Sequence, residues 1–454
     1  MGRRQPNRSL AALLTEADWT AGELARAVNA LGVRYGLRLR YDRTAIAHWL
    51  DGSRPRPPVP GLVAQAFGRR IGRVVHVGET GLTPVASPAH ETVLTTGDFI
   101  QRLSALCRAD ADPASRLALN RQMFTATDVR LPDWPAPVTP ATGPGGATGG
   151  SGRPVDDPRL TDVVVIFTDL TEKYGGAHAR SALGAYLADD VRYRLLAASH
   201  QDAQDFSLLG GSARLTHLLG WMAVDAGLPN FGYHCYWSAL EQAHRAGERN
   251  VFPLTLRAMS MLALRLDDVP HARQWARSAL EGAGPTVPPA VLARLYAGRA
   301  TVRAVDGERR AALDDLLAAE RHLEAADQGD ADPFRRYPLA AFLHRRGEVL
   351  LALGDRAEAV SAFRESLAAR PPNHRIARVL THTHLSRTLL ALGELETALD
   401  ECRQALGHYE FTASHRATTA LTAVGRALAP YRRHAGAREL RARITEATGP
   451  GGAR

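Results

Sequence analysis

Lysine, cysteine and long apolar runs are all scarce in this chain of 454 residues. Its only lysine is Lys173, so arginine supplies nearly all of the positive charge. Cys107, Cys235 and Cys402 are too few for a disulfide framework and too far apart for a CxxC metal pair, so we expect a reducing, cytoplasmic location. No apolar run approaches the roughly 18 residues that a membrane span requires, and we expect no membrane partner.

Motifs for common catalytic and metal chemistry are also missing. The sequence has neither HExxH nor GxSxG, and its GPGGATGG stretch lacks the GK[ST] ending of a phosphate-binding loop. His382 and His384 are two residues apart, and side chains with that spacing do not face each other on a helix. We therefore expect no metal site, no catalytic residues, no cofactor and no enzymatic activity.

Positive charge is concentrated near the N-terminus. Residues 1–80 contain thirteen arginines and six acidic residues, which give +7 of the formal net charge of +9. A local basic field attracts polyanions and speeds their encounter with the protein. Nucleic acid is therefore an expected partner of this region.

Residues 1–82 have the pattern of a compact helical domain. We predict a first helix over 9–17, a third over 43–50 and a fourth over 59–67, and expect residues 71–82 to close the domain. Thr20 and Glu23 have capping-box spacing at the start of the second helix, and Gly32 is expected to end it. Asp42 is expected to cap the third helix.

The predicted third helix has two different faces. At about 100° per residue, Ile46, Trp49 and Leu50 fall on one side of it. The opposite side is small and polar, and the basic strip RPRPP follows at residues 54–58. An apolar inner face, a polar outer face and a basic flank are what a DNA recognition helix needs.

The helix order and the pattern R-T-x-I-x-x-W-L-x-G resemble the helix-turn-helix domains of repressor-like regulators of the XRE class. The residues that carry the resemblance are Leu24, Ala25, Thr44, Ile46, Trp49 and Gly52. It implies that the third helix lies in the major groove of double-stranded DNA, while the start of the second contacts the phosphate backbone. In this chain, about ten residues join the two helices, where the XRE class has a tight turn.

The resemblance assigns DNA contacts to particular residues. Four are expected to face base edges: Arg43, Thr44, Ala47 and His48. Three are expected to bind phosphates: Arg40, Arg54 and Arg56. Thr20, at the start of the second helix, is also expected to contact DNA. Because one module buries too little surface for tight specificity, we expect a homodimer on two half-sites.

A connector and a linker are predicted next. Residues 83–130 are expected to form a helical connector, with helices over 97–106 and 116–124. Residues 131–159 are rich in Pro, Gly and Thr and almost free of aliphatic side chains, so we expect a disordered linker. Residues 163–167, VVVIF, are strand-like in composition, but no second strand is available to pair with them, and we predict a helix.

A helical pattern repeats within residues 160–447. Each copy has Gly or Asp between two helices and a small residue five positions later, and in four of the five copies a larger residue follows after four more. These pairs are Gly227/Gly232, Asp267/Ala272, Gly307/Ala312, Gly354/Ala359 and Gly393/Ala398, spaced 40, 40, 47 and 39 residues apart. Small residues at fixed places let two helices approach closely, and neighbouring hairpins then stack.

The copy at residues 343–371 closely resembles the tetratricopeptide (TPR) repeat. The matching residues are Gly347, Leu350, Gly354, Ala359, Phe363 and Pro371, and the copy at 385–406 keeps most of them. The resemblance implies an α-solenoid that binds a peptide or protein in a groove lined by the first helix of each pair. The residues expected in this partner-binding groove are Arg257, Arg294, His344, Arg345, His382 and Arg387.

The chain is thus predicted to be all-α, with an N-terminal helix-turn-helix domain and a C-terminal TPR-like α-solenoid of helical hairpins. This order of parts resembles actinobacterial XRE-like helix-turn-helix/TPR transcriptional regulators of differentiation or secondary metabolism. The resemblance implies a DNA-binding regulator whose repeats sense a peptide or protein partner or mediate oligomerisation. The alternative is a TPR adaptor or scaffold whose basic N-terminal module contacts protein rather than DNA.

Overall fold

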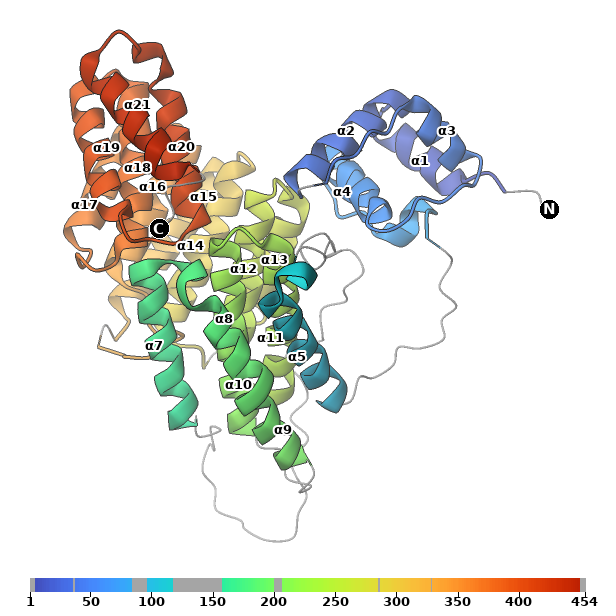
Figure 1. Ribbon diagram of the computed structural model, residues 1–454, viewed down its shortest axis with the longest axis horizontal. Coiled ribbons are helices and arrows are strands. Elements are labelled where there is room, and N and C mark those ends of the chain that lie inside the picture. The colour runs from blue at the N-terminus through green and yellow to red at the C-terminus, as the bar shows by residue number, and fades with distance from the viewer. Residues whose placement is uncertain are drawn as a thin grey trace.

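The computed structural model describes residues 5–35, 37–83, 96–116, 157–199, 206–284, 286–327 and 329–449. All regular secondary structure in these ranges is helical, which confirms the predicted all-α class (Figure 1). Within the same ranges, no helix combines the length and apolar character needed to cross a membrane. Residues 131–156 of the predicted linker, and the connector helix beyond Arg116, lie outside the described residues.

The N-terminal domain consists of four α-helices and a short 3₁₀-helix. These are α1 (Arg8–Glu16), α2 (Ala21–Arg34), α3 (Arg43–Leu50), α4 (Val59–Ile71) and η1 (Val77–Thr80). The predicted capping box of Thr20 and Glu23 begins α2, and Asp42 caps α3. The helices enclose an apolar core that includes Leu24, Ile46 and Phe67, all fully buried.

The predicted end of the second helix at Gly32 is wrong, because α2 continues to Arg34. Gly32 is needed for a different reason. Leu39 packs so closely against the helix that a Cβ atom at position 32 would lie 2.7 Å from Leu39 Cδ1. A glycine can mark either the end of a helix or a place where another residue packs closely against the backbone. At Gly32 it is the close packing of Leu39 that requires glycine.

Among the described residues, four α-helices lie between the N-terminal domain and the repeats. They are α5 (Thr96–Ala111), α7 (Pro158–Tyr174), α8 (Gly176–Tyr186) and α9 (Arg192–Ser199), with a π-helical turn, η3 (Leu187–Val191), before α9. Residues 163–167 lie within α7, so the prediction of helix there is confirmed. Helix α7 begins at Pro158, inside the last residues of the predicted linker.

Five helical hairpins follow, and a sixth pair of helices ends the described chain. The hairpins are α10 (Phe206–Asp225) with α11 (Pro229–Ala246), α12 (Val251–Arg265) with α13 (Val269–Glu281), α14 (Pro289–Val305) with α15 (Arg309–Glu324), α16 (Leu339–Ala352) with α17 (Arg356–Ala368), and α18 (Arg375–Leu392) with α19 (Leu395–Tyr409). The last pair is α20 (His415–Ala427) and α21 (Ala435–Thr448), separated by η4 (Ala429–Tyr431).

The repeated Gly or Asp positions all adopt the left-handed backbone conformation that turns one helix into the next. Their φ angles are 83° at Gly227, 56° at Asp267, 82° at Gly307, 88° at Gly354 and 86° at Gly393. Asp is one of the few residues with a side chain that tolerates this region, which explains the single exception to Gly. The predicted hairpin turns therefore lie at the predicted residues.

The small residues of the pattern are all buried where the two helices of a hairpin meet. At Gly232, an added Cβ would lie 2.5 Å from Val224 Cγ2 on the facing helix. A second small position, seven residues before each turn residue, was not recognised in the sequence. Its members, also buried, are Gly220, Ser260, Ala300, Gly347 and Ser386. Together the two positions set the close contact between paired helices.

The two serines at this second position also make equivalent hydrogen bonds. Ser260 Oγ donates to the carbonyl of Ala272 at 2.7 Å, and Ser386 Oγ donates to the carbonyl of Ala398 at 2.8 Å. Both acceptors are the predicted small residues of the same hairpin. The repeat is therefore preserved in its hydrogen bonding as well as in its packing.

The row of hairpins bends until its end meets its beginning. Asp225, at the end of α10, accepts hydrogen bonds from the Gly176 N–H at 2.8 Å and from Ser414 Oγ at 2.9 Å. The Ala413 N–H donates to the Tyr174 carbonyl at 2.6 Å. The α7–α8 junction thus joins the first hairpin to the segment that leads into α20.

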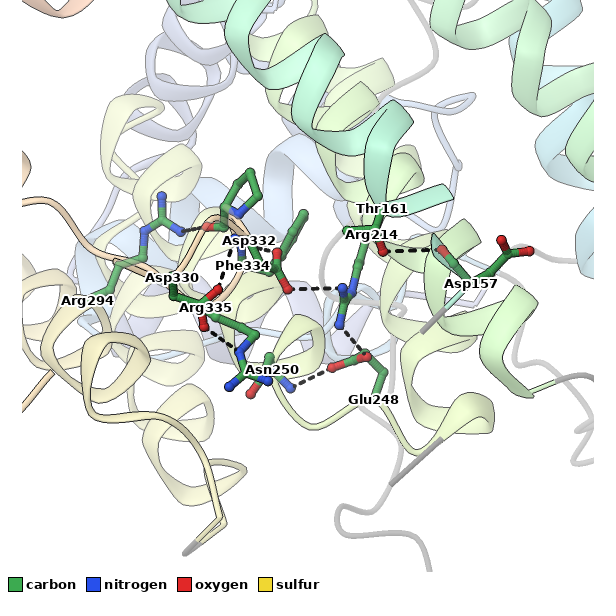
Figure 2. A network of polar contacts seen from close by, with 11 residues as sticks. Asp157, Thr161, Arg214, Glu248, Asn250, Arg294, Asp330, Asp332, Phe334 and Arg335 are labelled. Atoms are coloured by element: carbon green, nitrogen blue, oxygen red, sulfur yellow. Dashed lines mark hydrogen bonds and ion pairs between the residues drawn. The ribbon is translucent and has the colours of Figure 1, made fainter. Parts of the chain in front are cut away.

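The loop between α15 and α16 is fixed onto α10 by a buried ionic network (Figure 2). The Arg214 guanidinium donates to Asp332 at 3.1 Å and to Glu248 at 3.0 Å, and its side chain is only 3% exposed. Asp332 also accepts the Phe334 N–H at 2.8 Å, and the Phe334 ring packs on His217. One arginine therefore anchors a loop that lies over a hundred residues away in sequence.

The N-terminal domain contacts the turn between α12 and α13. Gln65 Nε2, on α4, donates to Asp268 Oδ2 at 3.0 Å and to the Tyr35 hydroxyl at 3.1 Å. Arg69 donates to the Leu266 carbonyl, and Arg34 pairs with Asp267. Burial, together with the Asp268 carboxylate, raises the pKa of Tyr35 to about 12.

Candidate nucleic-acid interface

Helix α3 presents the faces predicted from its sequence. Ile46 and Trp49 are buried, and Leu50 is partly buried against the same core. Asp42 Oδ1 accepts the Ala45 N–H at 3.0 Å and starts the helix. The four residues expected to face base edges are all exposed: Arg43, Thr44, Ala47 and His48. The structure therefore brings these four together on one accessible face.

The segment before α3 is held by Asn29. The side chain of Asn29, on α2, bonds both to the carbonyl of Tyr41 at 2.8 Å and to its N–H at 2.9 Å. The Tyr41 ring packs edge-on against Trp49, with 5.0 Å between ring centroids. The connection is longer than in the XRE class, but it is fixed at its far end by these contacts.

The end of α3 is held by the start of the chain. The Asn7 N–H donates to the Leu50 carbonyl at 2.7 Å. The Asn7 side chain donates to the Thr80 carbonyl at 2.9 Å and accepts the Leu10 N–H at 3.0 Å. Asn7 thus connects α1, α3 and η1, a role that the sequence pattern did not suggest.

Four arginines near α3 keep their charge available. Arg40, Arg43, Arg54 and Arg56 are exposed, and none of them forms an ion pair with another described residue. On another part of the domain, Arg73 pairs with Glu16 at 3.0 Å and with Glu79 at 2.9 Å. Arg8, Arg26 and Arg38 are also exposed without an ion pair among the described residues, so positive charge is available around α3 without being confined to it.

Thr20 already has bonding partners at the start of α2. Its hydroxyl donates to Glu23 Oε2 at 2.7 Å and accepts the Glu23 N–H at 3.3 Å. The Thr20 N–H donates to Glu23 Oε2 at 2.8 Å, and this bond, together with that of the hydroxyl, lowers the pKa of the Glu23 carboxyl. Thr20 is exposed, but the structure gives it a capping role, and a phosphate contact there would compete with the cap.

Helix α3 lies on the side of the N-terminal domain that is farther from the repeats (Figure 1). Figure 1 shows α3 at the far side of the N-terminal domain, whereas α4 and the end of α2 lie nearest α13. The contacts of Gln65 with Asp268 and of Arg34 with Asp267 agree with this arrangement. A long ligand could therefore approach α3 without meeting the hairpins.

Three of the predicted groove residues lie close together in the repeats. Arg257 Nε donates to the carbonyl of Arg294 at 3.2 Å, and the Arg294 guanidinium lies 5.9 Å from the centre of the Tyr337 ring. Burial lowers the pKa of Arg257 to about 9, and the charges of Arg345 and Arg294 act in the same direction. Helix α14, which carries Arg294, packs against both α12 and α16, so the three arginines lie on adjacent helices.

Two more arginines join this group and were missed in the sequence. Burial lowers the pKa of Arg265, on α12, to about 10, and the charges of Arg416, on α20, and Arg345, on α16, contribute. We call Arg257, Arg265, Arg294, Arg345 and Arg416 the arginine cluster. The nearest acidic partners are Glu348, 2.6 Å from Arg345, and Asp225, 3.8 Å from Arg416.

The other three predicted groove residues do not all lie with the arginine cluster. His344 borders the arginine cluster, and Arg387 is exposed on α18. His382 is buried elsewhere: its Nδ1 lies 2.6 Å from Glu401 Oε2 on α19, and its ring stacks on His408. The structure therefore brings His344 to the arginines and places His382 apart from them.

Comparison with known proteins finds a match for the N-terminal part of the chain. A family model described as the SP15 N-terminal domain matches residues 10–83. The match begins within α1 and ends just after η1, so it covers the unit that carries α3. No curated protein matches the chain.

Proposed function

We propose that this chain is a DNA-binding transcriptional regulator of the helix-turn-helix type, acting in the cytoplasm. The observation that carries the proposal is the exposed face of α3, held at both ends and flanked by four arginines without ion-pair partners among the described residues. Uncompensated positive charge around a small polar helix face is suited to a duplex with its phosphates on either side of a groove.

In this proposal each residue type has a separate role. Arg43 donates to a guanine edge, and Thr44, Ala47 and His48 complete the reading face. Arg40, Arg54 and Arg56 bind phosphates and set the orientation of the module without reading sequence. A homodimer places two such modules on successive half-sites and supplies the surface that one module lacks.

The repeats, in the same proposal, form a TPR-like α-solenoid that binds an acidic peptide or an acidic segment of a protein. The support is the arginine cluster, whose five guanidinium groups outnumber the neighbouring carboxylates of Glu348, Asp225 and Glu172. Helix α12 carries Arg257 and Arg265 and leads directly into the turn that contacts α4. A partner that moves α12 would therefore act on the N-terminal domain through its contact with Asp268.

A salt titration of DNA binding tests the proposal. The full chain is mixed with genomic fragments in a gel-shift assay, and the logarithm of its binding constant should decrease linearly with the logarithm of salt concentration. Replacing Arg40, Arg54 and Arg56 with Ala should reduce that slope by about 1 for each phosphate that the variant no longer neutralises. The exposed Arg277 on α13 provides a matched control, and Arg277→Ala should leave the slope unchanged.

The adaptor alternative gives a different result in the same assay. If the N-terminal module contacts protein rather than DNA, no fragment is retained at low salt. That outcome would contradict the proposal, because non-specific phosphate binding alone should be visible under those conditions.

A further inference from the structure

Three potential metal ligands converge from two neighbouring hairpins. His344 and Glu348 lie four residues apart on α16, and His384 lies on α18. The Nε2 atoms of His344 and His384 are each 3.6 Å from Glu348 Oε1, and the three ligand atoms lie within 4.8 Å of one another. No metal site was expected from the sequence, because His382 and His384 do not face each other on one helix. Sequence spacing does not reveal residues that meet across hairpins.

The hydrogen bonds of His344 fix which of its nitrogens carries the proton. Thr381 Oγ1 donates its only proton to the carbonyl of Ala377 at 2.7 Å. The contact of 2.8 Å between His344 Nδ1 and Thr381 Oγ1 must therefore have Nδ1 as the donor. In the neutral ring, Nε2 is then the unprotonated nitrogen. That lone pair faces the Glu348 carboxylate with no proton between them.

The other two ligands are also prepared for a cation. Arg345 Nη1 lies 2.6 Å from Glu348 Oε2, which leaves Oε1 directed at the two imidazoles. The Nε2 atom of His384 faces Glu348 Oε1, and its Nδ1 has no hydrogen-bond partner among the described residues. The Phe363 ring packs against both imidazoles, at centroid distances of 5.7 and 5.5 Å.

We propose that His344, Glu348 and His384 form a binding site for a divalent transition metal, with Zn²⁺ the best suited. Two imidazole nitrogens and one carboxylate oxygen are typical zinc ligands, whereas Mg²⁺ and Ca²⁺ prefer oxygen alone. Ligands at about 2.1 Å from a tetrahedral zinc ion lie about 3.4 Å from one another. The two observed nitrogen–oxygen distances of 3.6 Å are near that value.

The site leaves one coordination position for a ligand from outside the protein. Three protein ligands around a tetrahedral ion leave the fourth place open. Arg345 and the rest of the arginine cluster lie beside Glu348, so an anion is the favoured fourth ligand. A bound metal would also connect α16 to α18, and so join two successive hairpins.

Metal titration of the full chain tests the site. The protein is prepared without a histidine tag, treated with a chelator and titrated with Zn²⁺ by calorimetry and with Co²⁺ by visible absorption. The wild type should bind one equivalent and give the intense absorption of tetrahedral Co²⁺. Glu348→Gln and His384→Ala should each weaken Zn²⁺ binding by at least about 100-fold, since each removes a direct ligand.

Two further variants separate a metal site from a structural effect. Thr381→Val keeps the side-chain shape but removes the oxygen that accepts the Nδ1 proton of His344. It should weaken Zn²⁺ binding by about 10–100-fold. His322→Gln changes a histidine on α15 outside the site and should bind like the wild type. The proposal is overturned if folded wild type binds no stoichiometric Zn²⁺, if Glu348→Gln and His384→Ala bind normally, or if His322→Gln weakens binding equally.

Discussion

The amide of Asn29 forms a two-point hydrogen-bonded clamp on the main chain of Tyr41, at 2.8 and 2.9 Å. The two residues are twelve positions apart. Asn29 lies in α2, and Tyr41 lies just before α3, at the end of the connection between the two helices. A side chain thereby does here what a tight turn does in the helix-turn-helix class: it sets the position of the third helix relative to the second.

Replacing Asn29 with Ala should destabilise the N-terminal domain by about 1–3 kcal/mol, because both polar groups of Tyr41 lose their partner. Specific DNA affinity should decrease as well, since α3 is no longer fixed in place. Denaturant unfolding and gel shifts measure the two effects. Asn373→Ala, at an exposed position, is the control and should change stability by less than about 0.5 kcal/mol. Wild-type behaviour of the Asn29 variant would show that the clamp does not position α3.

Arg43 tests whether α3 reads bases. Arg43→Ala should cost about 1–3 kcal/mol of binding free energy on the specific site and much less on random DNA, because the variant can no longer donate to a base edge. Gel shifts with both DNAs at one salt concentration measure the difference. An equal decrease on the two DNAs would instead identify Arg43 as a residue that binds phosphate.

Replacing the buried Arg214 should destabilise the repeats, because this side chain joins α10 to two acidic residues. Arg214→Met leaves Asp332 and Glu248 without their common partner, and we expect a loss of about 3–5 kcal/mol. The exposed pair of Arg277 and Glu281 is the comparison, and Arg277→Met should cost about 0–1 kcal/mol. Unfolding in guanidinium chloride measures both. Similar losses of stability for the two variants would mean that the ion pairs of Arg214 contribute no more than an exposed pair.

Gly232 tests the close approach of α10 and α11. In Gly232→Ala the new Cβ would lie 2.5 Å from Val224 Cγ2, and the overpacking should cost about 1–3 kcal/mol. The double variant with Val224→Ala should recover part of that loss. Gly407→Ala, in α19 with open space around it, should be neutral or stabilise the protein by up to about 1 kcal/mol. Thermal unfolding of the wild type and these variants measures each difference.

His217 should make the repeats sensitive to acid. Burial, with smaller effects of Arg294 and Arg257, lowers the pKa of His217 to about 3. The unfolded chain takes up a proton near its ordinary pKa of about 6.5, so this contribution to stability is present above pH ~6.5. It should decrease as the pH falls from about 6.5 towards 3, by up to about 1.4 kcal/mol per pH unit.

The comparison for this prediction is His217→Gln, which cannot take up that proton. Its free energy of unfolding should depend less on pH between about 6.5 and 4 than that of the wild type. Parallel pH profiles for the two proteins would show that His217 takes up its proton at the same pH in the folded and the unfolded protein.

Local sequence determined much of the helical framework. The caps at Thr20 and Asp42 and the turns at Gly227, Gly354 and Gly393 depend on the chemistry of one residue and its close neighbours. The faces of α3 follow from helical spacing alone, which is why Ile46 and Trp49 could be assigned to the core. Gly32 shows the limit of this reasoning, because its role is set by contact with Leu39.

The sequence by itself therefore determined the all-helical class, the hairpin turns and the exposed face of α3, since these depend on periodicity and backbone preference. Only the tertiary structure decided which distant side chains meet. It brought Asn7 to Leu50, Gln65 to Asp268, and His384 to His344 and Glu348. No local pattern encodes these meetings, because they depend on how whole hairpins stack and bend. The proposed metal site is of this second kind, whereas the proposed DNA-reading surface is largely of the first.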